Sequence, residues 1–288
     1  MALPLVVGVD GSDSCLLAVD WAVDEAVRHG VPLRLVHGSL WERYEGALPG
    51  TGGGRPSEQV LAEHIVAHAA ERAERHHPDV KVTTDTLPED AATALVHEGA
   101  AAFAVVTGSR GRGPLKGLLL GSVGLAVAAR AHCPVVVVRG DRAGLAGTHG
   151  RILLGLGDAD TGSEALRFAF READVRGCTL DVVRAWRHPA HEVSGEGTRA
   201  DEPADATASA LLDASLHALS AEYPQVRTHR SALEGPASKV LVNRSAAADL
   251  VVIGARRRTG PFGLQLGRVG HTLLHHAQCP VAIVPQQS

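Results

Sequence analysis

Short apolar runs alternate with longer amphipathic stretches from one end of the chain to the other. In the first half, the apolar runs predict strands near residues 4–9, 32–38, 80–85, 103–107 and 134–138. The stretches between them predict helices near 14–29, 57–76, 90–100 and 122–131, the first with Leu17, Trp21 and Ala22 on one apolar side. Strands that alternate with helices, with apolar central strands, are typical of a parallel sheet covered on both faces. The fold class is therefore α/β.

The same pattern occurs twice. Trp21-Ala22 matches Phe168-Ala169 at an offset of 147 residues, and Cys133-Pro134 matches Cys279-Pro280 at an offset of 146. The second half repeats the strand order with LLGL, LDVV, RTHR, LVVIG and PVAIV. We therefore predict two tandem domains, 1–140 and 149–288, each built on a five-stranded parallel sheet. A glycine-rich connector, 139–150, joins them.

Composition narrows the function classes. The chain has 288 residues, 45% of them apolar, and a net charge of −4, which argues against a broad nucleic-acid or anionic-membrane surface. No apolar run approaches the length of a membrane span, and the N-terminus reads as a strand rather than a signal peptide. The four cysteines lack CxxC spacing, so we expect a cytoplasmic chain with reduced thiols, of which Cys133 and Cys279 are buried. The HxxxH pair at His64 and His68 has no third ligand, and we expect solvated histidines and no metal site.

Candidate chemistry gathers in the stretch VVTGSRGRGPLKGLLLGS, residues 105–122. It contains the spacing G-x2-G-x9-G-S, formed by Gly108, Gly111, Gly121 and Ser122. A second polar stretch, Asp10-Gly11-Ser12, follows the first strand. In parallel sheets ligands bind beyond the carboxyl ends of the strands, where the strand order reverses, and both stretches fall there. Neither the Walker A motif nor the dinucleotide fingerprint is present.

This stretch has the properties of an anion cradle. Glycines bring backbone N–H groups close to a ligand, and Ser122 stands where a helix begins, so its hydroxyl and the first-turn amides would face the same anion. Arg110, Arg112 and Lys116 add positive charge, and Asp10 can accept from a ribose hydroxyl or a base amine. Together they predict a nucleotide site. The alternative is a flexible loop whose glycines only make turns.

The motifs GVDGS (8–12) and GSRGRGPLKGLLLGSV (108–123), followed by HCPVVVV, closely resemble the universal stress protein family. The resemblance covers both repeats and implies Rossmann-like domains of the ATP-binding branch. It implies that Asp10 and the backbone near Gly38 hold the adenosine, and that family members pair through their fifth strands, here Val135–Val138 and Val281–Val284. The ribose and phosphates would contact Gly108, Gly111, Gly121, Ser122 and Val123. Gly8, Arg110 and Arg112 complete the candidate set.

The second copy departs from the first where chemistry matters. Asp10 corresponds to Gly157, Gly111 to Arg257 and Ser122 to Arg268. We expect the second domain to bind ATP poorly or differently. Its arginines at 256, 257, 258 and 268 either capture another anion or are solvated, with the old pocket partly filled, and we favour the second reading.

The predicted function is an ATP-binding stress or regulatory protein, active as a homo-oligomer, in which nucleotide stabilises one conformation or assembly. We expect no enzyme, because no carboxylate is placed to activate a water, and any hydrolysis would be slow and incidental. The phosphate charge makes Mg²⁺ a candidate companion of ATP. The alternatives are an ATPase or nucleotidyl-transferring enzyme, and an interaction module that binds no nucleotide.

Overall fold

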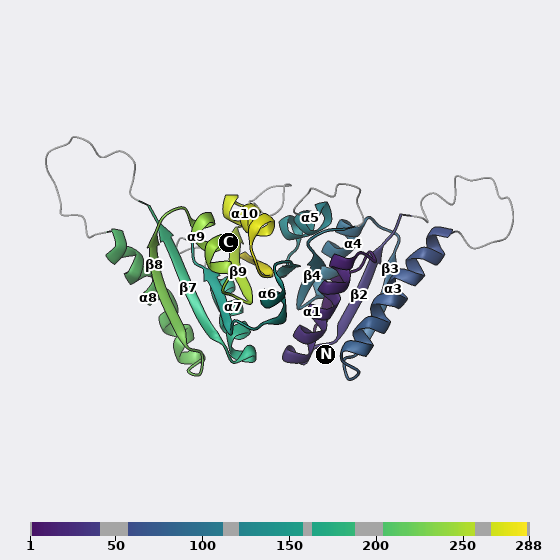
Figure 1. Cartoon of the computed structure of the whole chain (residues 1–288), viewed down its shortest axis with the longest axis horizontal. Helices are drawn as coiled ribbons and strands as arrows, with labels where there is room; N and C mark the ends of the chain where they lie inside the picture. The colour runs from purple at the N-terminus through teal and green to yellow at the C-terminus, as the bar shows by residue number, and fades with distance from the viewer. Residues whose placement is uncertain are drawn as a thin grey trace. The chain divides into compact units, whose positions relative to one another are not determined.

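The computed structural model describes residues 2–40, 57–111, 121–157, 163–187, 204–256 and 266–286. It divides into two compact units, the first containing Met1–Arg139 and the second containing Gly140–Arg257 and Leu266–Ser288. Within each unit the strands lie side by side as a parallel sheet with helices packed against it, as Figure 1 shows. The predicted α/β class with a repeated domain is confirmed.

The first unit orders its strands β3-β2-β1-β4-β5, all parallel. Helices α1 and α3 pack together on one face, and α4 and α5 pack together on the other. The strands are β1 (Leu5–Gly8), β2 (Leu33–Gly38), β3 (Val82–Leu87), β4 (Ala104–Gly108) and β5 (Val135–Val138). The helices are α1 (Asp13–His29), α3 (Ser57–His76), α4 (Ala91–Glu98) and α5 (Ser122–Arg130), with a 3₁₀ turn at Gly99–Ala101.

The second unit repeats this arrangement in the order β8-β7-β6-β9-β10. Its strands are β6 (Arg151–Gly155), β7 (Thr179–Trp186), β8 (Thr228–Glu234), β9 (Leu250–Arg256) and β10 (Val281–Gln286). Its helices are α6 (Arg142–Ala146), α7 (Ser163–Arg176), α8 (Ala204–Glu222), α9 (Ala237–Ser245) and α10 (Arg268–His276). None of the described helices is long and apolar enough to cross a bilayer.

Two expectations need correction. Leu17 is 47% exposed, because the buried side of α1 follows Ala18, Ala22 and Ala26 and leaves Leu17 on the outer surface. The predicted connector contains α6, whose first turn is capped by the Asp141 side chain accepting from Gly144 N at 2.8 Å. A Cβ on Gly140 would lie 2.2 Å from the Gln278 carbonyl oxygen, so glycine there permits close packing within the second unit.

One strand-to-helix ion pair occurs in both units with its charges exchanged. In the first unit Arg34 on β2 donates to Glu98 of α4 at 2.6 Å, and this bond raises the pKa of the guanidinium above its ordinary value. In the second unit Asp181 on β7 accepts from Arg244 of α9, also at 2.6 Å. Asp181 and Arg244 stand at the positions that correspond to Arg34 and Glu98. The link between strand and helix is therefore kept while its polarity is reversed.

The two pairs differ in burial, and this predicts unequal costs of breaking them. The Asp181 side chain is 2% exposed and also has the His229 ring nitrogen at 3.2 Å, whereas Glu98 is 20% exposed. Asp181→Asn leaves the Arg244 charge uncompensated, and we expect it to lower the free energy of unfolding by about 3 kcal/mol. Glu98→Gln should cost about 1 kcal/mol. Urea denaturation of both variants checks this, and an equal or larger cost for Glu98→Gln would contradict it.

The prediction of buried thiols at Cys133 and Cys279 is confirmed. Cys15, Cys133 and Cys279 are buried, and burial raises the pKa of the Cys133 thiol to about 11. Desolvation likewise raises the pKa of the half-buried Cys178 thiol to about 11. His64 and His68, on α3, are both exposed, as expected for solvated histidines.

A thiol reagent should therefore distinguish folded from unfolded protein. At pH 8 the native chain should react slowly with iodoacetamide at Cys133 and Cys178, because the reactive thiolate is scarce there, and rapidly after denaturation. Peptide mass spectrometry after timed quenching measures both rates. Fast labelling of Cys133 in the native state would show that this thiol is not packed in the core.

Candidate functional site

The carboxyl ends of β1 and β4 form the switch point of the first unit. The chain leaves β1, adds β2 and β3 on one side, and returns to place β4 on the other side of β1. Asp10 follows β1, and the glycine-rich stretch follows β4, so the two predicted parts of the site lie at adjacent strand ends. Parallel sheets bind ligands at this kind of edge.

Ser12 fixes the carboxylate of Asp10. The Oδ1 atom of Asp10 accepts from the Ser12 amide at 3.0 Å and from the Ser12 hydroxyl at 2.7 Å. The Ser12 hydroxyl also accepts from Cys15 N at 3.2 Å and thereby caps α1. The start of the helix and the orientation of the carboxylate therefore depend on one side chain. With Oδ1 occupied, Oδ2 is the atom available to a ligand.

Asp10 lies close to Gly111, so the structure brings the two predicted parts of the site together. A Cβ at residue 111 would lie 2.8 Å from Oδ2 of Asp10, so only glycine fits beside the carboxylate as it stands. The repeat comparison agrees, since Gly157 and Arg257 replace these two residues together.

The ends of the glycine-rich stretch are held by hydrogen bonds, which corrects part of the predicted cradle. Gly121 N donates to the Ser109 carbonyl at 2.7 Å, and Arg110 N donates to Ser14 Oγ at 3.1 Å. These two amides therefore donate to protein oxygens and are not available to a ligand. Arg112 and Lys116 lie outside the described residues.

The first turn of α5 supplies the donors instead. Gly121 is the N-cap residue. Among the bonds between described residues, the first amide of α5 with a partner is that of Leu125, which donates to the Gly121 carbonyl at 3.3 Å. The amides of Ser122, Val123 and Gly124 precede that bond at the positive end of the helix. Ser122 is the first helical residue rather than the cap, and it is exposed. These amides can receive an anion.

Three candidate glycines have a packing role in the structure. A Cβ on Gly38 would lie 2.6 Å from the Ala91 Cα, at the start of α4, and one on Gly108 would lie 2.7 Å from the Ser14 carbonyl oxygen in α1. A Cβ on Gly8 would lie 2.6 Å from a methyl of Leu95. These glycines let the helices approach the strand ends. Their contact with a ligand stays a prediction.

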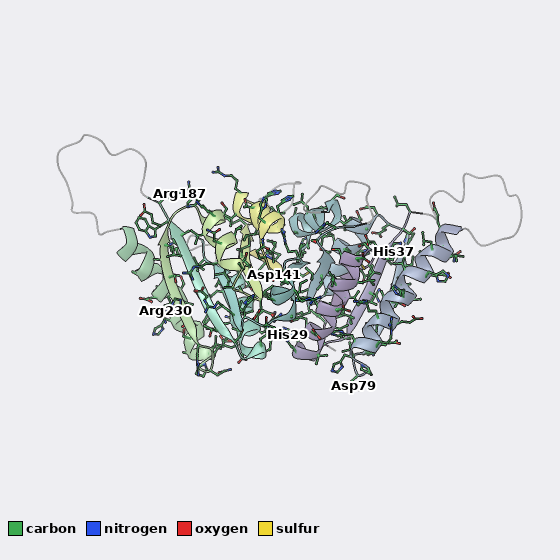
Figure 2. The ribbon with its side chains drawn as sticks, viewed as in Figure 1. His29, His37, Asp79, Asp141, Arg187 and Arg230 are labelled. Carbon is green, nitrogen blue, oxygen red and sulfur yellow. The ribbon has the colours of Figure 1, made fainter. Side chains whose placement is uncertain are left out.

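His37 was missed by the sequence reading. Its Nδ1 lies 2.7 Å from the Val9 carbonyl oxygen, which requires a proton on Nδ1, and Figure 2 labels the residue on β2. The β1–β2 ladder ends at the pair Gly8 and Val36. In a continued ladder the Gly38 amide would donate to the Val9 carbonyl, but the His37 imidazole donates to it instead. The Gly38 amide is thereby left at the ligand edge. Its position directly before the candidate residue Gly38 is the sequence feature that could have identified it.

The second unit reverses the charge of the same edge. In the first unit Val9 N donates to the Val36 carbonyl at 2.9 Å, and in the second Leu156 N donates to the Val183 carbonyl, also at 2.9 Å. The next residue is Asp10 in the first unit and Gly157 in the second, so these two residues correspond. Arg184 takes the place of His37, and its guanidinium donates to the Gly157 carbonyl. Arg268 takes the place of Ser122 at the start of α10.

Fold and site define a tandem α/β protein whose first unit carries a glycine-rich stretch at the carboxyl edge of its parallel sheet. The Universal stress protein family model matches residues 1–139 and 148–285, and the chain belongs to this family. Universal stress protein Rv2623 of Mycobacterium tuberculosis is 31% identical over 292 residues, which cover 98% of this chain and 96% of that protein. The crystal structure of a universal stress protein from Archaeoglobus fulgidus has a TM-score of 0.73 at 18% identity and covers 99% of this chain and 98% of its own.

A further structure shows a universal stress protein from Archaeoglobus fulgidus in complex with dAMP. It is 23% identical, covers 48% of this chain and 98% of its own, and has a TM-score of 0.35.

The packing of the glycines predicts which of them contribute to the stability of the ligand-free protein. Gly38→Ala should lower the free energy of unfolding of the ligand-free protein by about 2 kcal/mol, because its Cβ meets the backbone of α4. Gly121→Ala should change it by less than about 0.5 kcal/mol, because its Cβ would lie 3.6 Å from the nearest atom. Urea denaturation without nucleotide checks both, and equal losses would contradict the packing argument.

Proposed function

We propose that this universal stress protein binds ATP in its first unit and acts as a regulator rather than as an enzyme. One observation carries the proposal: Ser12 holds Asp10 against Gly111, at the strand end next to the uncapped first turn of α5. This pairs an acceptor suited to hydroxyls and amines with donors suited to phosphates. The second unit belongs to the same family model and has lost the acceptor.

Each part of the nucleotide has a candidate partner. Oδ2 of Asp10 and the amide of Gly38 would hold the adenosine, the first by accepting and the second by donating. The amides of Ser122 and Val123 would hold phosphate oxygens, and the side chain of Arg110 would add a positive charge beside them. Gly111 would let the ribose approach the backbone next to Asp10.

Binding without turnover fits the state of Asp10. Activating a water would need a carboxylate oxygen free to take a proton. The Oδ1 atom of Asp10 accepts two bonds from Ser12, and Oδ2 would be taken by the adenosine. Mg²⁺, if it accompanies ATP, would be bound mainly by the phosphates, which remain strong oxygen ligands without a dedicated protein cage. Bound ATP would stabilise the first unit by mass action and so report nucleotide supply.

We place the protein in the cytoplasm, where its free cysteines would stay reduced. We also propose that it works as a homo-oligomer, which light scattering of the purified chain with and without ATP would test.

A negative charge at the proposed phosphate position tests the nucleotide site. Ser122→Glu puts a carboxylate at the first position of α5, where it favours the helix but repels phosphate. We expect the ATP affinity, measured by isothermal titration calorimetry, to fall at least about tenfold. Ser238→Glu makes the same change in the first turn of α9, in the second unit, and should leave the affinity unchanged.

Three results would overturn the proposal. Unaltered ATP affinity in Ser122→Glu would remove α5 from the site, and absence of ATP binding to the unaltered chain would favour the nucleotide-free alternative. Sustained phosphate release faster than about one per minute would replace the regulator by an enzyme. Mass spectrometry of an acid extract of the purified protein would identify the nucleotide it carries.

A further inference from the structure

The second unit keeps the helix terminus of the nucleotide edge and exchanges its side chains for arginines. We propose that this edge is a separate site for a small phosphorylated ligand, recognised through its phosphate and without a nucleoside. The argument concerns described residues of the second unit alone, namely Gly157, Arg184, Arg256 and Arg268. It goes beyond the ATP site and does not depend on it.

Among the described residues, the position of Asp10 carries no side-chain acceptor in the second unit. Gly157 stands at the Asp10 position by the shared register of β1 and β6, so no carboxylate meets a ribose hydroxyl or base amine at that residue. Arg184 instead donates to the Gly157 carbonyl and so lies over the end of β6, the strand in the middle of the edge. A cation is thus held by the backbone at the point where the first unit holds an anion.

Arg268 is placed where a cation costs energy unless an anion is near. It is the first residue of α10, and Gly267, the N-cap residue, provides no side chain to the uncapped amides. The positive end of a helix dipole disfavours a guanidinium, and no acidic residue stands in the first turn of α10 to offset it. A bound phosphate would accept from these amides and neutralise both charges.

Arg256 supplies a third cation from a separate element. It is the last residue of β9, the strand next to β6, and it is exposed. Arg187, labelled in Figure 2, follows β7 at the same carboxyl edge. Arginines from β7, β9 and α10 therefore stand at the carboxyl edge of one sheet. The planar fork of guanidinium matches phosphate with two parallel hydrogen bonds, which favours a phosphorylated ligand over a simple halide or carboxylate.

The test uses the full chain with its first site blocked. Ser122→Glu serves as the background, and inorganic pyrophosphate is the probe, titrated by calorimetry at low salt. We expect one pyrophosphate site to remain in this background. Arg268→Glu should weaken it at least about tenfold, and Arg184→His, which restores the residue of the first unit, should weaken it in the same direction.

The control and the stability readout separate binding from general effects. Arg227→Glu makes the same charge change before β8, at the opposite edge of the sheet, and should leave pyrophosphate affinity within about twofold. Arg268→Glu should also keep or raise the melting temperature without ligand, because an acid suits the first turn of a helix. A merely structural arginine would instead lower it.

Three outcomes would overturn the proposal: no pyrophosphate site in the Ser122→Glu protein, an unchanged affinity in Arg268→Glu, or an equal loss in Arg227→Glu, which would show only attraction by overall charge. Arg268→Ser provides a milder second variant if Arg268→Glu does not fold, and it must weaken binding too. ATP affinity of the unaltered chain is measured separately, so failure of either site is recognised without affecting the other.

Discussion

The contact between Asp10 and Gly111 constrains the functional edge of the first unit. Ser12 ties the carboxylate to the cap of α1, and a Cβ at residue 111 would lie 2.8 Å from the free oxygen of Asp10. A larger residue at position 111 would therefore require the carboxylate to move from the position in which Ser12 holds it. The same glycine gives a ligand access to the backbone, so one steric condition serves both packing and binding.

The two repeats show that scaffold and site obey different constraints. The ion pair between the second strand of each sheet and the helix packed on it survives with Arg34–Glu98 replaced by Asp181–Arg244. Either polarity satisfies the packing because the interaction requires only opposite charges. The edge has no such symmetry: an acceptor at residue 10 recognises hydroxyls and amines, and the guanidinium of Arg184 cannot replace it.

The sequence was sufficient for the strands and for most of the helices, because apolar runs and turn residues act locally. It predicted α3 and α5 closely and placed Asp10 and Gly111 at one edge. It did not predict α6, whose glycines fit the backbone at Gln278, far away in sequence. The capping role of Gly121 and the bond from His37 to Val9 were missed for the same reason: each depends on which strands become neighbours.

If both proposed sites exist, their geometry accounts for a repeat that binds an anion without a nucleoside. Amides at the start of α5 and α10 point outward because every helix leaves its first donors without partners, and no side-chain exchange removes them. What differs is the local charge: the first unit sets the carboxylate of Asp10 beside these amides, and the second sets Arg184 and Arg268 there. A negative group near the amides limits which anions enter and orients the rest of the ligand. Its replacement by cations would increase the attraction for phosphate and would remove the group that we propose to select the nucleoside.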